Sequence, residues 1–272
     1  MVIAGADTYC TDPERERPFF SRLFLSPLFT FYPQYFWIIY WNGRKALKGR
    51  YGHQEWADSS LDVMQALENV GVRFEITGMD NLRGFDGPAV FISNHMSTLE
   101  TMVLPCIIQP VKSATFIVKE SLITMPFFGP IMRSRDPVVV GRVNPREDLK
   151  AVLEKGSAKL RSGMSIIIFP QSTRTSGFDP ADFNTLGIKL ASRAGVPVVP
   201  IALKTDAWGI GRFIKDFGPI NRDKKVCIRF GEPMVISGRG AAEHEKIVAF
   251  IRDNLRAWSG AGGTACGGGR EQ

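Results

Sequence analysis

The sequence predicts an α/β domain with a mainly parallel or mixed sheet flanked by helices, preceded by an aromatic helical segment that anchors the chain to a membrane. From residue 73 onward, short apolar runs alternate with helical patterns, which is typical of α/β folds. The run Ile166-Ile167-Ile168-Phe169 is apolar without a break, as expected of a strand that is covered on both faces. Residues 18–41 are crowded with Phe, Tyr and Trp, and this enrichment predicts the anchor.

The length and net charge of the chain limit its possible functions but do not select one. The 272 residues suit one large domain with an appendage. Lys and Arg number 34 against 27 Asp and Glu, a net charge of +7, which fits a polyanion, an anionic membrane surface or a phosphorylated substrate. The four cysteines lack metal-site spacing, so we expect no metal and a reducing compartment. The basic residues are not interleaved with aromatics as in an RNA-binding motif, so we expect no nucleic-acid partner.

We expect residues 1–17 to be disordered and residues 18–72 to form a membrane-anchoring and amphipathic helical segment, with helix continuing through 42–72. Pro27 and Pro33 interrupt the apolar stretch, and aromatic residues favour the membrane interface. A monotopic helical hairpin on the cytoplasmic face is therefore favoured over a single span. The alternative is a buried aromatic clasp over the core. Basic residues that suit anionic headgroups follow at Arg44, Lys45, Lys48 and Arg50.

Residues 73–258 form the predicted α/β domain. Strands are expected at 73–77, 89–93, 114–118, 138–140, 165–169, 197–203 and 226–230. Helices are expected at 98–108, 120–133, 146–161 and 184–194, followed by a last amphipathic helix through Ile247, Ile251, Leu255 and Trp258. The Gly-rich residues 259–272 are expected to be a disordered tail.

A histidine directly follows one predicted strand. His95 comes after the strand 89–93, and Glu100 follows five residues later. A neutral imidazole held by a carboxylate can take a proton from an alcohol at neutral pH, and the positive end of a helix disfavours its protonated form. Positions five apart diverge by about 140° on a helix, so the two side chains meet only if His95 precedes the helix. We expect Ser93 or Asn94 to cap that helix. The alternative is a helix-start histidine that makes only local hydrogen bonds.

Two arginines also follow predicted strands. Arg142 comes just after 138–140, and Arg174 ends the segment Phe169-Pro170-Gln171-Ser172-Thr173-Arg174. With the Ser172 and Thr173 hydroxyls, these arginines could clamp a phosphate, although either could instead be a surface or ion-pair residue. No GxGxxG, GxxxxGK[ST], HExxH or GxSxG motif is present.

Taken in order, these segments resemble the glycerolipid acyltransferases typified by 1-acylglycerol-3-phosphate acyltransferase. The family's Asn-His-x4-Asp block corresponds to Asn94-His95-x4-Glu100. Its Lys-x2-Leu-x3-Pro-x2-Gly block, which ends in an arginine, corresponds to Lys119, Leu122, Pro126, Gly129 and Arg142. Its Phe-Pro-Glu-Gly-Thr-Arg block corresponds to Phe169–Arg174, and its apolar strand ending in proline to Val198-Val199-Pro200-Ile201. The resemblance covers about residues 75–235.

The chain departs from the family pattern at four positions. Glu100 stands for the usual Asp, Gln171 for Glu and Ser172 for Gly, and Asp136 falls where the second block often has Gly. The longer side chain of Glu100 holds the His95 ring only if the backbone retreats to make room for it.

The resemblance implies transfer of an acyl group from acyl-CoA or acyl carrier protein, a co-substrate rather than a cofactor, to the hydroxyl of lysophosphatidate or a related lysophospholipid at an anionic membrane surface. It implies that His95 is the base and that Glu100 orients it. The acceptor phosphate would be bound by Arg142, Thr173, Arg174 and Lys119. Asn94, Ser97, Gln171 and Ser172 would have supporting roles. The alternatives are an acyltransferase of the same fold for another lipid, and a catalytically weak lipid-binding protein at the membrane.

Overall fold

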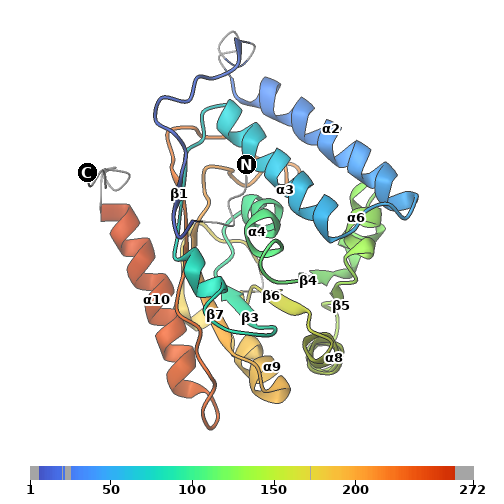
Figure 1. Ribbon diagram of the computed structural model, residues 1–272, viewed down its shortest axis with the longest axis vertical. Helices are drawn as coiled ribbons and strands as arrows, with labels where there is room; N and C mark the ends of the chain where they lie inside the picture. The colour runs from blue at the N-terminus through green and yellow to red at the C-terminus, as the bar shows by residue number, and fades with distance from the viewer. Residues whose placement is uncertain (1–5, 20, 22–25, 172, 261–272) are drawn as a thin grey trace.

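An eight-stranded sheet lies at the centre of the described structure (Figure 1). The structure is a computed structural model, and it describes residues 6–19, 21, 26–171 and 173–260. The strand order is β1-β2-β8-β7-β3-β6-β4-β5. In chain order the strands are β1 (Tyr9–Cys10), β2 (Phe74–Thr77), β3 (Val90–Ser93), β4 (Ala114–Lys119), β5 (Val138–Val140), β6 (Ser165–Ile168), β7 (Val198–Lys204) and β8 (Val226–Phe230). All seven predicted strands are present, with ends that differ by at most one residue.

The sheet is mixed, as predicted. The pairs β3–β6, β3–β7, β4–β6, β4–β5 and β2–β8 are parallel, whereas β1–β2 and β7–β8 are antiparallel. In the centre, Phe91 of β3 lies opposite Ile167 of β6 and Val199 of β7. The five mutually parallel strands β7, β3, β6, β4 and β5 therefore end at one edge of the sheet, where ligands bind in open α/β folds.

Helices cover both faces of the sheet, which explains the unbroken apolar strands. The helices α2 (Leu28–Leu47), α3 (His53–Asn69) and α4 (Leu99–Ile108) lie on one side, and α8 (Ser157–Arg161), α9 (Leu186–Ala194) and α10 (Ala241–Gly260) lie on the other (Figure 1). Phe91 and Ile167 belong to the first apolar core, and their neighbours Val90, Ile92 and Ile166 belong to the second. This alternation is the two-residue period of a strand.

Residues 6–17 are ordered although we expected disorder over residues 1–17; residues 1–5 lie outside the described residues. Strand β1 pairs with β2 at the edge of the sheet. The Tyr9 hydroxyl, the Thr11 hydroxyl and the Arg15 guanidinium donate hydrogen bonds to the buried carboxylate of Glu68. A buried carboxylate needs hydrogen-bond donors, and these bonds to Glu68 hold the N-terminal residues in place. The N-terminal residues have little apolar pattern of their own, so their order could not be predicted from local sequence.

The aromatic segment forms a longer helix than its prolines predicted. Pro27 directly precedes α2, where no backbone N–H is required, and Pro33 lies inside the helix. The helical stretch expected over 42–72 is instead divided, because Gly49 adopts a left-handed conformation between α2 and α3. The first arm of the expected hairpin includes residues 20 and 22–25, which lie outside the described residues. None of the described helices is long and apolar enough to cross a membrane.

Three other expected helices differ in detail. The helix predicted over 120–133 is split into α5 (Glu120–Thr124) and α6 (Phe128–Ser134), because Phe127 between them has a φ of 60°. The helix predicted over 146–161 is α7 (Pro145–Ala151), a π-helical turn η3 (Val152–Gly156) and α8. The last helix, α10, continues to Gly260, so two residues of the expected tail are helical and the other twelve, 261–272, are not described.

Candidate active site

The candidate residues gather where the parallel strands end. His95 follows β3, Lys119 ends β4, Arg142 follows β5, and Thr173 and Arg174 follow β6. All five line one cavity of about 1270 Å³. The sheet therefore brings together residues that are up to 79 positions apart in the sequence, from His95 to Arg174.

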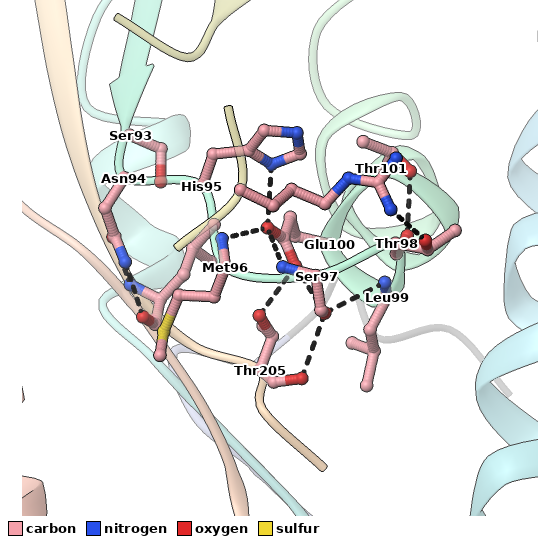
Figure 2. Close-up of polar contacts among 12 residues, drawn as sticks. Ser93, Asn94, His95, Met96, Ser97, Thr98, Leu99, Glu100, Thr101 and Thr205 are labelled. Carbon is pink, nitrogen blue, oxygen red and sulfur yellow. Dashed lines mark hydrogen bonds and ion pairs between the residues drawn. The ribbon is translucent and has the colours of Figure 1, made fainter. Parts of the chain in front are cut away.

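His95 and Glu100 are paired despite the longer carboxylate. The imidazole Nδ1 lies 2.9 Å from Glu100 Oε1, and the other ring nitrogen points away from Glu100 (Figure 2). His95 precedes α4, which begins at Leu99, so the two side chains meet as the sequence requires. An ionised carboxylate only accepts, so Nδ1 carries the proton and Nε2 has a free lone pair. The histidine side chain is 15% exposed and borders the cavity.

The Glu100 carboxylate is fully buried and accepts five hydrogen bonds. Besides His95, Oε1 accepts from the backbone N–H groups of Met96 at 2.6 Å and Ser97 at 2.8 Å. Oε2 accepts from the hydroxyls of Ser97 at 2.8 Å and Thr205 at 2.6 Å (Figure 2). Glu100 also lies in the first turn of α4, where the helix dipole favours negative charge.

This surrounding keeps Glu100 ionised. Burial by itself raises the pKa of the carboxyl, but the hydrogen bond and charge of His95, the Thr205 hydroxyl and the Ser97 backbone outweigh it, so the pKa of Glu100 is lowered. A carboxylate that stays charged beside His95 stabilises the imidazolium that forms when the ring accepts a proton.

Ser93 and Asn94 do not cap α4, contrary to our expectation. The Ser93 hydroxyl donates to the Ile201 carbonyl. The Asn94 amide donates to the Leu203 carbonyl at 2.8 Å, and its oxygen accepts from the Leu203 N–H at 2.9 Å. Both side chains thus add hydrogen bonds to β7 at the end of β3, where Ser93 is the last residue of the strand and Asn94 follows it. The first helical N–H, that of Leu99, donates instead to the Ser97 hydroxyl.

Gln171 joins the histidine loop to the loop after β6. Its side-chain oxygen accepts from the His95 backbone N–H at 2.7 Å, and its amide nitrogen donates to the Thr175 hydroxyl at 3.0 Å. The Thr175 N–H donates in turn to the His95 carbonyl. The Thr175 hydroxyl donates its one proton to the Gly177 carbonyl, so it can accept from the Gln171 amide but has no proton for a carboxylate, and the amide suits the place. Ser172, the other departure in this segment, lies outside the described residues.

Three further contacts at the site were not predicted from the sequence. Phe169 stacks on the His95 ring at a centroid distance of 4.3 Å. Thr205, which holds Glu100, follows β7. Asp216 pairs with Arg174, whose guanidinium also donates to the Thr98 hydroxyl at 2.7 Å. Thr205 could have been predicted as a site residue only from the sheet topology, because β7 lies beside β3 and both strands end at the same edge.

The cationic residues differ in how they are held. Arg174 is fixed by Asp216 and Thr98 in an ion-paired, partly buried position. Arg142 has a φ of 57°, unusual for a residue with a side chain, and its backbone N–H donates to the Asp148 carboxylate at 2.8 Å. Lys119 and Thr173 are exposed at the cavity. Among residues 6–19, 21, 26–171 and 173–260, there is no cluster of three or more His, Cys, Asp or Glu side chains that could bind a metal ion.

Comparison with known proteins identifies acyltransferases that are similar to this chain. The model of the family described as Acyltransferase matches residues 73–204. A 1-acyl-sn-glycerol-3-phosphate acyltransferase of Pseudomonas aeruginosa is 26% identical over 235 residues, which cover 86% of this chain and 80% of that protein. A chloroplastic 1-acyl-sn-glycerol-3-phosphate acyltransferase of Arabidopsis thaliana is 33% identical over 131 residues, 48% of this chain, and the match spans only 36% of the plant protein.

A solved structure shares the fold. The crystal structure of a 1-acyl-sn-glycerophosphate acyltransferase from Thermotoga maritima superposes with a TM-score of 0.64 at 19% identity, covering 88% of this chain and 97% of that one. At this identity the likeness establishes the architecture of the sheet and its helices.

We predict that Glu100→Gln lowers the free energy of unfolding at pH 7 by about 2 kcal/mol, because charge-assisted hydrogen bonds are replaced by neutral ones. The pKa of Glu100 is lower in the folded state than its ordinary value of 4.5, so its contribution is complete above that value and is lost as the pH falls through the folded-state pKa. Urea unfolding of both proteins from pH 7 down to pH 3, through and below the ordinary value of 4.5, measures the difference. A gap that stays constant or widens in acid would contradict the lowered pKa.

Proposed function

This chain belongs to the acyltransferase family, and we propose that it acylates the free hydroxyl of lysophosphatidate or a related lysophospholipid. It is an O-acyltransferase, as its relatives are. The observation that carries the proposal is the buried Glu100 carboxylate holding His95 at the edge of a cavity that also contains Arg142 and Arg174.

The proposed reaction needs one base and no covalent enzyme intermediate. His95 Nε2 removes the proton from the acceptor hydroxyl while the oxygen attacks the thioester carbonyl of the donor. The tetrahedral intermediate expels the thiolate, and the proton on His95 passes to the thiolate or to solvent. Glu100 keeps Nδ1–H as the donor and stabilises the transient imidazolium. The stacked Phe169 ring restricts the imidazole plane.

The cationic side of the cavity would bind the acceptor phosphate. Arg142, Arg174, Lys119 and Thr173 supply donors that match phosphate oxygens. Arg174 is already paired with Asp216, so a phosphate would either share the guanidinium or displace the carboxylate. Fixing Arg174 in advance lowers the conformational entropy lost when an acceptor binds.

Much of the cavity lining is apolar and suits a fatty acyl chain. The apolar lining includes Ile39 of α2, Val63 of α3, Met102 of α4, Phe116 of β4 and Ile131 of α6. We propose acyl-CoA or acyl carrier protein as the donor, since a thiolate leaves readily without further activation.

We also propose that α2 anchors the protein at the cytoplasmic face of an anionic membrane without crossing it. One face of the helix is fixed in the core, where Phe31 and Tyr35 pack against Trp208. The other face exposes Trp37 and Trp41, aromatic residues of the kind enriched at membrane interfaces. The basic residues Arg44, Lys45 and Lys48 lie at its C-terminal end.

We predict that His95→Ala lowers acyl transfer by about three orders of magnitude, because the base is lost. The protein is incubated with acyl-CoA or acyl carrier protein and a mixture of lysolipids, and the products are identified by mass spectrometry. The wild type should form phosphatidate. His244→Ala on α10 is the matched control and should retain activity. Unchanged turnover by a folded His95→Ala protein would refute the assigned base.

We predict that Arg142→Gln and Arg174→Gln each raise the KM for lysophosphatidate by about tenfold or more, because a charge-assisted contact to phosphate is lost. The preference for lysophosphatidate over monoacylglycerol, which lacks the phosphate, should fall in parallel. Arg193→Gln, on α9 outside this cavity, is the control. Equal losses on both acceptors would mean that these arginines do not recognise the phosphate.

We predict that replacing Trp37 and Trp41 together by Ser weakens partitioning onto anionic phospholipid vesicles by about tenfold, because two interfacial aromatic side chains are lost. Vesicle sedimentation measures the effect. Val235→Ser removes a side chain that is 80% exposed between β8 and α10, and it should leave partitioning unchanged. Equal partitioning of the double variant and the wild type would exclude α2 as the anchor.

A further inference from the structure

A loop between β7 and β8 carries two adjacent, exposed apolar residues, Phe213 and Ile214. Phe213 at its tip is 94% exposed and Ile214 is 57% exposed. Isolated exposed side chains are common on protein surfaces, but two adjacent large ones on a projecting loop form an apolar tip. The exposed charged residues that flank this tip, Arg212 and Lys215, are both basic.

The base of the loop is rigid. Trp208 and Ile220 form a β-bridge, and the Gly209 N–H donates to the Pro219 carbonyl at 2.8 Å. A side chain at Gly218 would collide with the Gly209 carbonyl oxygen at 1.7 Å, so the two arms of the loop touch through their backbones. Trp208 is completely buried. The two ends of the loop that carries the apolar tip are thus joined by close backbone contacts.

The inner side of the same loop belongs to the site. Phe217 packs against Phe36 and Tyr32 of α2, with ring centroids 5.3 and 5.9 Å apart, and Tyr32 donates to the Gly218 carbonyl. Asp216 pairs with Arg174. Ile210 and Lys215 line the cavity together with Phe36 and Tyr40 of α2. The loop and α2 therefore adjoin each other and both border the cavity.

We propose that the loop 209–219 is a second lipid-contacting element, separate from α2. Phe213 and Ile214 enter the interfacial region of an anionic bilayer, while Arg212 and Lys215 contact headgroup phosphates. The basic flanks favour an anionic bilayer over a second copy of this chain, whose net charge is +7. The loop's place at the cavity puts that bilayer beside the site, and in this respect the inference rests on the proposed function.

The test compares full-length variants on vesicles. Phe213→Ser combined with Ile214→Ser should weaken partitioning about tenfold on vesicles of phosphatidylcholine mixed with phosphatidylglycerol. Arg212→Gln combined with Lys215→Gln should weaken it about tenfold on the mixed vesicles and little on phosphatidylcholine alone. Val235→Ser, which changes an apolar side chain that is 80% exposed outside this loop, is the control. Circular dichroism and thermal melting verify that each variant is folded.

Activity separates this inference from the proposed function. With a short-chain lysophosphatidate that is monomeric in solution, the Phe213→Ser/Ile214→Ser variant should keep wild-type turnover, whereas with a vesicle-embedded acceptor its KM should rise about tenfold. Wild-type partitioning by the variant would overturn the inference, as would a wild-type dimer that the variant converts to monomer with vesicle binding unchanged. If the wild type acylates no acceptor, the proposed function fails while the partitioning result still decides the role of the loop.

Discussion

The buried Glu100 carboxylate is the constraint on which the arrangement of the site depends. A charge removed from water is tolerated only when hydrogen bonds replace its hydration, and here five of them do so. The donors come from the loop after β3 and from Thr205 after β7. The neighbouring Asn94 amide joins the same two strand ends through Leu203. The same five hydrogen bonds therefore depend on the register of β3 with β7, on the start of α4 and on the orientation of His95. A shift in any of these would remove hydrogen-bond partners from the buried charge.

The extra methylene of Glu100 is accommodated by the path of the chain before α4. Because His95 lies outside the helix, the carboxylate can curl back toward the helix start and accept from the Met96 and Ser97 N–H groups as well as from the imidazole. It satisfies backbone donors that precede the helix and fixes the ring tautomer with the same oxygen. The Gln171 side chain accepts a hydrogen bond from the His95 backbone N–H, so the loop after β3 is bonded both to Glu100 and to Gln171.

Local pattern was sufficient to predict every described strand except β1, which depends on long-range contacts. The central strands are unbroken apolar runs, so their positions were predictable to within a residue. Strand β1 is ordered because a carboxylate 57 residues from Thr11 requires donors. Thr205 could be assigned to the site only once β7 was known to lie beside β3. The pairing of His95 with Glu100 was predictable in part, because its spacing is local, whereas the Asp216 partner of Arg174 lies in a loop 42 residues away.

The aromatic helix α2 shows why core and surface interpretations of the N-terminal segment need not exclude each other. Phe31 is buried against Trp208 while Trp37, six residues along the same helix, is 65% exposed. Gly43 adds a close approach, because a side chain there would meet the Phe127 carbonyl oxygen at 2.5 Å, so α2 also lies tightly against the chain before α6. A helix fixed in this way cannot turn its exposed aromatic face independently of the domain. Because Phe36 and Tyr40 of the same helix line the cavity, any surface that covered the exposed aromatic face would lie beside the cavity.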